Sequence, residues 1–215
     1  MSLTLLEEYI ESGNAAAIDN LLHTNPALCQ QKTSHEISPL LLACYYNKNQ
    51  IVKIILQHIQ EITIWEAAAA GLTDVVSELL EESPGLLDAF SEHGFTALGM
   101  ATHFGNIDIV RYLLLKGADP NLASQNGYQV YPLHAAISAN FDEIAKMLVE
   151  AGAEVNVLQA ARTSPLHIAA QNGNIEMLIL LLENGALVGI KNDFGKTAAD
   201  LAAEKGHVEI AKILS

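Results

Sequence analysis

The stretch from Gly189 to Thr197 carries the residue types of a phosphate-binding loop. It reads Gly-Ile-Lys-Asn-Asp-Phe-Gly-Lys-Thr, so a glycine is followed by a lysine and a threonine that could contact a nucleotide phosphate. A P-loop needs four residues between its glycines and a buried strand before it. This stretch has five and follows a predicted helix and turn. The sequence therefore argues against nucleotide binding here.

Eight histidines could in principle bind a metal ion. We expect His23 and His58 at the ends of helices, where an imidazole is solvated or makes a favourable contact with the helix dipole. His35 and His93 occupy equivalent positions and are expected on the surface, because no carboxylate or thiol lies at ligand spacing on the same short element. The sequence thus predicts no metal site and no cofactor.

The candidate nucleophiles are Cys44 and scattered serines. The segment around Cys44 resembles the segment around Ala170, and Cys44 takes the place of that small residue. We therefore expect its thiol to be packed in the interior and unreactive. Cys29 is likewise expected in the core. Adjacent carboxylates are expected on solvated helix faces, at Glu7-Glu8, Glu81-Glu82 and Asp142-Glu143. No acid-base pair is held in a recognisable cleft, and we expect a protein that is not an enzyme.

Acidic residues dominate the charge of the chain. Eleven Lys and Arg against 25 Asp and Glu give a formal charge of −14, which repels phosphate and argues against nucleic acid and anionic membranes as partners. The longest aliphatic run, Met177 to Leu182, is far shorter than the ~20 residues of a membrane span. The first eleven residues carry acids and no basic group, unlike a leader peptide. We expect a cytoplasmic location.

The elements that would position these residues are set by an internal repeat. The ten residues Ser164 to Gly173 recur in similar form, and each copy ends in a Gly or Asn suited to a left-handed helix end. In the best copy, Ser164 is a good N-cap, Pro165 fits the first turn, and an apolar helix follows from Ile175 to Leu182. The end residues fall 24 to 35 residues apart, at Gly13, Asn47, Gly71, Gly105, Asn140, Gly173 and Gly206.

This pattern resembles the ankyrin repeat family, whose unit is a β-turn finger plus two antiparallel helices with a Thr-Pro-Leu-His-x-Ala signature. The signature appears as Ser164-Pro165-Leu166-His167-Ile168-Ala169 and as Tyr131-Pro132-Leu133-His134-Ala135-Ala136. The resemblance implies an all-α solenoid, in which His134 and His167 tie a helix start to the adjacent loop. It covers residues 1–215 as a single ankyrin repeat domain, with units at about 1–34, 35–58, 59–91, 92–124, 125–158, 159–191 and 192–215.

A second period of 58 residues lies within the first. His23 to Leu28 aligns with Glu81 to Leu86, so the first two units look like a copy of the next two. The copies meet at a seam near 59–63, where we expect a missing finger. The simpler interpretation is one continuous stack with a short loop, and the alternative is a kink or hinge.

The resemblance also implies a protein-binding scaffold whose fingers and first-helix ends line a concave face. Aromatic residues, which are common at binding hot spots, gather at these positions. Asn121 and Asn156 fall where asparaginyl hydroxylases modify some ankyrin proteins. The expected partner is an unidentified protein with a basic or neutral surface, bound by a monomer. Rival functions are an enzyme or small-ligand site in the groove and a self-associating structural protein. The expected partner-binding residues are Tyr45, Tyr46, His93, Phe95, His103, Phe104, Tyr128, Gln171 and Asn172.

Overall fold

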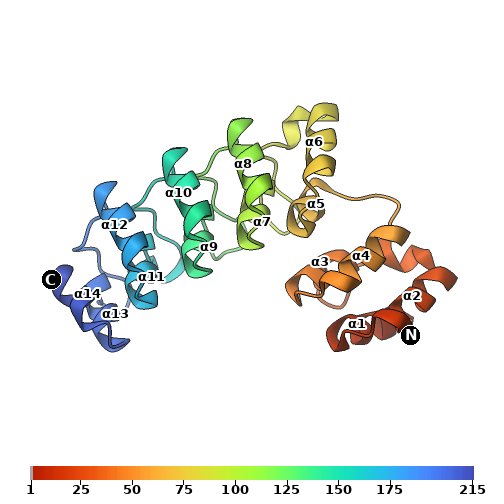
Figure 1. Cartoon of the computed structure of the whole chain (residues 1–215), viewed down its shortest axis with the longest axis horizontal. Helices are drawn as coiled ribbons and strands as arrows, with labels where there is room; N and C mark the ends of the chain where they lie inside the picture. The colour runs from red at the N-terminus through yellow and green to blue at the C-terminus, as the bar shows by residue number, and fades with distance from the viewer. Residues whose placement is uncertain (1) are drawn as a thin grey trace. The chain divides into compact units, whose positions relative to one another are not determined.

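Residues 2–215 are described by a computed structural model, and they form 14 α-helices and no β-strand (Figure 1). The expected all-α fold of paired helices is confirmed. The contacts divide the chain into a first unit that ends at Val76 and a second unit that begins at Ser77. This division lies inside α6 (Thr73–Glu82) and does not coincide with the seam expected near 59–63. Each unit is described by itself.

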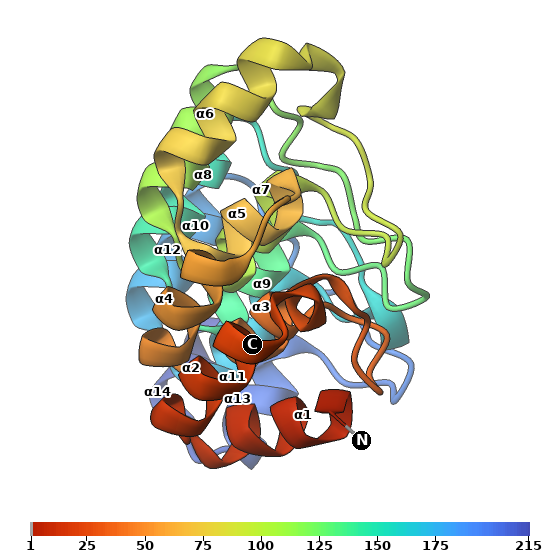
Figure 2. The ribbon, with the colours of Figure 1, turned by 90° about the vertical axis from the view of Figure 1, so that its right-hand side faces the viewer.

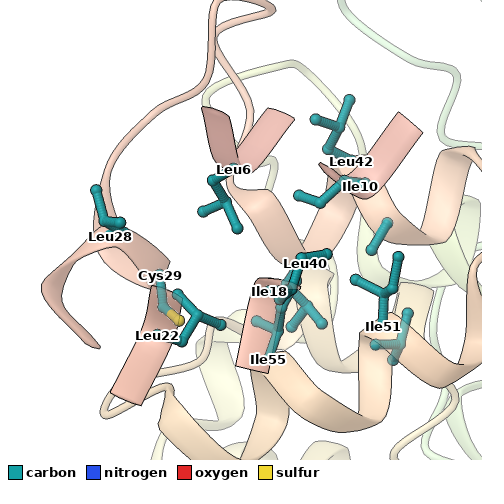
Figure 3. Close-up of a cluster of buried hydrophobic side chains, with 12 residues drawn as sticks. Leu6, Ile10, Ile18, Leu22, Leu28, Cys29, Leu40, Leu42, Ile51 and Ile55 are labelled. Carbon is teal, nitrogen blue, oxygen red and sulfur yellow. The ribbon is translucent and has the colours of Figure 1, made fainter. Parts of the chain in front are cut away.

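The first unit is held together by a core of aliphatic side chains. Helices α1, α3 and α5 pack in sequence, and α2 packs on α4. Figure 3 shows side chains such as Leu6, Ile18 and Ile55 converging, all fully buried. Their helices are α1 (Ser2–Ser12), α2 (Ala15–Thr24), α3 (Pro39–Tyr45), α4 (Asn49–His58) and α5 (Ile64–Ala70), with the 3-10 helix η1 at Pro26–Gln30.

The second unit stacks its helices in two rows. The first helices of successive pairs, α7, α9, α11 and α13, contact one another, and the second helices α8, α10 and α12 form the other row. Figure 2 shows α8, α10 and α12 along one side and the connecting loops along the opposite side. The bounds are α7 (Ala97–His103), α8 (Ile107–Leu115), α9 (Pro132–Ser138), α10 (Asp142–Glu150), α11 (Pro165–Asn172), α12 (Ile175–Glu183), α13 (Ala198–Glu204) and α14 (Val208–Ile213), with 3-10 helices η2 (Pro84–Leu86) and η3 (Ala160–Arg162).

The repeat period is fixed by matching helix starts and ends. Side chains of Ser38, Thr96 and Ser164 each accept a hydrogen bond from a main-chain N–H in the first turn of the helix that follows. The expected left-handed ends are confirmed, with positive φ at Gly13, Asn47, Gly71, Gly105, Asn140, Gly173 and Gly206. The 58-residue copy is also visible in the helices: α2, α3 and α4 begin exactly one period before α6, α7 and α8.

Signature histidines connect each helix start to the next finger, as expected. His134 Nε2 donates to the Thr163 carbonyl at 2.9 Å, and His167 Nε2 donates to the Lys196 carbonyl at 3.1 Å. Ser164 Oγ lies 2.7 Å from His167 Nδ1, whereas Tyr131 occupies the N-cap position before His134 and caps no main-chain N–H. Within residues 2–215, His134 Nδ1 is therefore left without a hydrogen-bond partner.

Burial of His134 makes the stability of the protein sensitive to acid. Desolvation lowers the pKa of His134 from 6.5 to about 4, against the opposing effect of the hydrogen bond to Thr163. Between pH 6.5 and 4 the unfolded chain takes up a proton that the folded chain does not. The free energy of unfolding should therefore fall by about 3 kcal/mol as the pH drops through this range. Urea unfolding at several pH values should show this fall. His134→Gln should make it smaller, and the part that remains would come from His103 and His167, whose pKa values burial also lowers. An equal fall in the variant would contradict the assignment to His134.

Main-chain hydrogen bonds link the fingers of the second unit into a ladder. Gln125 N donates to Gly94 O at 2.8 Å, Ala160 N to Tyr128 O at 3.1 Å, and Asp193 N to Ala161 O at 3.1 Å. We call this set of contacts the finger ladder. The finger that contains Gln129 and Val130 closes from Ser124 N to Val130 O at 2.9 Å, whereas its neighbour closes from Ser91 N to Phe95 O at 2.8 Å. The closing bond thus spans six positions in the finger with Gln129 and Val130 and four in its neighbour, so this finger is two residues longer.

Asparagine amides tie the loops that follow the second helices. Asn121 accepts from Glu154 N at 2.8 Å and donates to Gly152 O at 3.1 Å. Asn156 repeats the pattern, accepting from Leu187 N at 2.9 Å and donating to Gly185 O at 3.0 Å. Both amides therefore use donor and acceptor atoms to hold one repeat on the next. Modification of either residue remains a prediction.

The connection between α4 and α5 has the short form expected at the seam. Helix α4 ends at His58 and α5 begins at Ile64, so residues 59–63 alone join them. Thr63 caps α5, and its N–H and hydroxyl both donate to Glu66 Oε2, at 2.9 and 2.7 Å. No room is left for a finger. The unit boundaries expected along 1–215 remain a prediction.

Gly94 should be essential to the finger ladder. Its φ is +75°, and an added Cβ would lie 2.9 Å from the Gln125 main-chain carbon. Gly94→Ala should therefore lower the free energy of unfolding by about 3 kcal/mol, because strain and steric clash add. Gly127→Ala is the matched control, with φ +85° and no atom within 4 Å of the added Cβ, and should cost about 1 kcal/mol. If urea unfolding shows the same loss of stability for both variants, the clash at Gly94 contributes little and the prediction is wrong.

Candidate interaction surface

Tyr45 and Tyr46 lie at the end of α3 in the first unit. Both remain exposed, at 44% and 41% of their maximum area. The Tyr46 hydroxyl donates to Glu11 Oε1 at 3.1 Å, and this hydrogen bond to a carboxylate is the main reason that the pKa of Tyr46 is raised. Burial of part of the Tyr45 ring raises the pKa of its hydroxyl. Tyr46 is therefore held in place by α1, which the sequence pattern does not reveal.

His103 and Phe104 occupy the equivalent position in the second unit. His103 ends α7 and is exposed, whereas Phe104 is half-buried. Their rings meet edge to face with centroids 4.9 Å apart. Neighbouring atoms still desolvate part of the His103 ring, which lowers the pKa of the imidazole. Of this pair, His103 is the residue that presents more of its side chain to solvent.

The predicted finger residues differ in how accessible they are. His93 and Phe95 are half-buried, and His93 Nε2 lies 3.5 Å from Glu92 Oε1. Tyr128 lies on the lengthened finger and is 67% exposed. Its own main-chain N–H donates to Asn126 Oδ1 at 3.3 Å, and its carbonyl accepts from the next finger. The main chain of Tyr128 is thus fixed while its ring faces solvent.

Gln171 and Asn172 close the first helix of the sixth repeat, and both are exposed. The Asn172 amide donates to the Ile137 carbonyl at 3.1 Å and to Asn140 Oδ1 at 3.2 Å. His207 Nε2 lies 3.2 Å from the Gln171 main-chain oxygen, on the other side of the repeat. Asn172 therefore also serves as a link between repeats.

Phe194 is an exposed aromatic residue that lies outside the predicted binding set. Phe194 is 76% exposed on the finger that closes from Asn192 N to Lys196 O at 2.9 Å. Asn192 Oδ1 accepts from Phe194 N and Lys196 N, each at 3.0 Å, so the amide fixes the turn that presents the ring. The signal was present in the sequence, because a Phe at the tip of a finger has no reason to be buried.

Both cysteine thiols are hard to ionise. Burial raises the pKa of the Cys29 thiol to about 11, and burial together with Glu66 raises that of Cys44 to about 12. Both thiols should therefore be poor nucleophiles, as expected. A shallow hollow of about 290 Å³ lies away from the fingers, between α6, η2 and α8. Its lining residues are Leu80, Glu81, Pro84, Leu87, Tyr112 and Lys116.

The helices of the described chain are short. Across residues 2–215, none has both the length and the apolar content required to cross a bilayer.

Known proteins share this repeat pattern. The family model described as "Ankyrin repeats (3 copies)" matches residues 64–159 and 133–215. Ankyrin repeat and SAM domain-containing protein 6 of Rattus norvegicus is 36% identical over 98 residues, which cover 46% of this chain and 11% of that protein. Probable 26S proteasome regulatory subunit p28 of Saccharomyces cerevisiae is 25% identical over 140 residues, covering 65% of this chain and 52% of that protein.

A third relative extends the same similarity. Ankyrin repeat domain-containing protein SAT10 of Stachybotrys chartarum is 28% identical over 148 residues, which cover 67% of this chain and 8% of that protein.

The matched region is a small part of two of these relatives, and it spans only about a tenth of the rat protein. Ankyrin repeats generally mediate protein–protein interaction and are typically non-catalytic. The family match, the paired helices, the signature histidines and the fingers agree: the chain belongs to the ankyrin repeat family.

Proposed function

We propose that this chain is a non-catalytic protein-binding scaffold that holds a partner against its fingers and first-helix ends, on the concave face. The observation that carries the proposal is the finger ladder, which fixes the main chain of successive fingers while exposed aromatic rings project from them. Such rings lose little conformational entropy on binding and are common at hot spots. A rigid spacing of these groups would give specificity.

Tyr128 and Phe194 are the strongest anchors in the second unit. They are 67% and 76% exposed, and the finger that contains Ala161 connects their two fingers through main-chain hydrogen bonds. His103 and Gln171 would add polar contacts from the helix ends. Tyr45 and Tyr46 would form the corresponding contact region of the first unit. The remaining predicted residues would both touch the partner and hold neighbouring residues in place, because they are half-buried or hydrogen-bonded: His93, Phe95, Phe104 and Asn172.

The charge of the chain favours one class of partner. A formal charge of −14 would attract a basic surface and slow the approach of acidic ones. We therefore propose a protein partner with a basic or neutral surface, bound by a monomeric scaffold in the cytoplasm, with nucleic acid and membrane excluded as partners. The yeast relative is named as a regulatory subunit of a larger protein assembly, and a comparable role within an assembly would suit this chain.

The double variant Tyr128→Ala and Phe194→Ala should weaken partner binding while leaving the fold intact. Removing two exposed anchors should reduce affinity by about 2 kcal/mol or more, whereas the midpoint of urea unfolding should change by the equivalent of less than about 1 kcal/mol. The measurement is quantitative mass spectrometry of proteins captured from a lysate of the source organism by each immobilised variant.

Leu115→Ala is the matched control. Leu115 is 80% exposed at the end of α8, in the row of second helices and away from the fingers. This variant should capture the same proteins as the unmodified chain. If the finger variant retains the specific partners, or if Leu115→Ala loses them, the binding face lies elsewhere and the proposal fails.

A further inference from the structure

Three potential metal ligands meet between α2 and α4 of the first unit. Asp19 and His23 are four residues apart on α2 and so share one face of that helix, and His58 is the last residue of α4. His58 Nε2 lies 3.3 Å from Asp19 Oδ1, and His23 Nδ1 lies 3.4 Å from the same oxygen. The ligand atoms of all three residues lie within 4.8 Å of one another. The spacing of Asp19 and His23 along the sequence already places both on one face of a helix, but it does not show that His58 lies beside them.

The spacing suits a metal ion better than direct hydrogen bonds. Charge-assisted N–H···O bonds are usually about 2.7–2.9 Å long, so contacts of 3.3 and 3.4 Å are long for such bonds. In a tetrahedral zinc site with bonds of about 2.0–2.1 Å, two ligand atoms lie about 3.3–3.4 Å apart. The two contacts to Asp19 Oδ1 therefore already have the length of tetrahedron edges. The third edge, between the two imidazole nitrogens, is at most 4.8 Å long and would adjust to the same length when an ion binds.

The accessibility of the side chains permits that adjustment. His23 is 68% exposed and can turn, whereas His58 is only 13% exposed and is held by its surroundings. The two rings meet edge to face with centroids 4.8 Å apart. His23 Nδ1 also lies 3.0 Å from the Asp19 main-chain oxygen and can donate a hydrogen bond to it, and a metal ion bound to Nδ1 would replace that proton. Both imidazoles would bind as neutral rings and the carboxylate as an anion.

The duplicated half of the chain shows that the repeat itself does not require this cluster. A shift of 58 residues places Ser77, Glu81 and Lys116 at the positions of Asp19, His23 and His58. In that copy Ser77 Oγ lies 2.9 Å from the Tyr112 hydroxyl, and Lys116 Nζ lies 5.3 Å from the centre of the Tyr112 ring. The equivalent positions there thus carry a hydroxyl pair and a cation near an aromatic ring in place of the three ligands.

We propose that Asp19, His23 and His58 bind a first-row divalent metal ion, with Zn²⁺ the best match to two imidazoles and one carboxylate. The ion would join α2 of the first repeat to α4 of the second. Three protein ligands leave a fourth position for water, as in zinc sites that remain open. The charge of −14 would help to draw a cation to the surface.

Zinc binding can be tested directly on the full chain after treatment with a chelator. Isothermal titration calorimetry with zinc chloride at neutral pH should show one site, and Co²⁺ should give the visible absorption of tetrahedral coordination. A saturating excess of Zn²⁺ should raise the Tm by several degrees, since the ion binds only the folded site. Absence of both the heat and the Tm shift would overturn the proposal.

Ligand variants identify the site. Asp19→Asn, His23→Ala and His58→Gln should each weaken Zn²⁺ binding by about 100-fold or more, because each removes a ligand. Asp19→Asn and His58→Gln keep much of the original side-chain size, and the Tm in chelator shows whether each variant is folded. His35→Ala, at an exposed histidine of the same unit, and Glu81→Ala, at the duplicated position, should bind as the unmodified chain does. Unchanged binding in the ligand variants would place zinc elsewhere and overturn the assignment.

Discussion

A short helix pair cannot bury its apolar faces alone, and every other feature of this chain depends on the stacking that buries them. Each first helix has 7 to 11 residues, below the length at which isolated helices are stable in water. Stability must therefore come from contacts between successive repeats. Hydrogen bonds also connect one repeat to the next, as between His134 and Thr163 and between Asn121 and Glu154.

Local signals in the sequence were sufficient to predict the fold. Ser164 as a cap, Pro165 in the first turn and Gly173 at the helix end are each defined by main-chain geometry within a few residues, so the pattern could be recognised without knowledge of packing. The shortened connection at 59–63 followed from residue count alone. The division of the chain inside α6 did not follow from the sequence, because it depends on contacts that exist only in the folded chain.

The candidate surface could be predicted only in part. Position in the repeat identified helix ends and fingers, but it did not show that Glu11 holds Tyr46 or that Asn172 contacts the preceding repeat. These contacts join residues about one repeat apart and depend on side-chain direction. The same limitation applies to Asp19 and His58, which lie 39 residues apart and meet only because α2 packs on α4.

The finger ladder has an evolutionary consequence. Its bonds run between main-chain atoms, as at Gly94 with Gln125 and at Tyr128 with Ala160, and so they form whatever side chain projects from the fingertip. A fingertip such as Phe194 can therefore be exchanged for another residue without loss of these bonds. Selection could retarget the surface one fingertip at a time while the scaffold keeps its stability, with the glycine at position 94 among the few positions that must stay fixed.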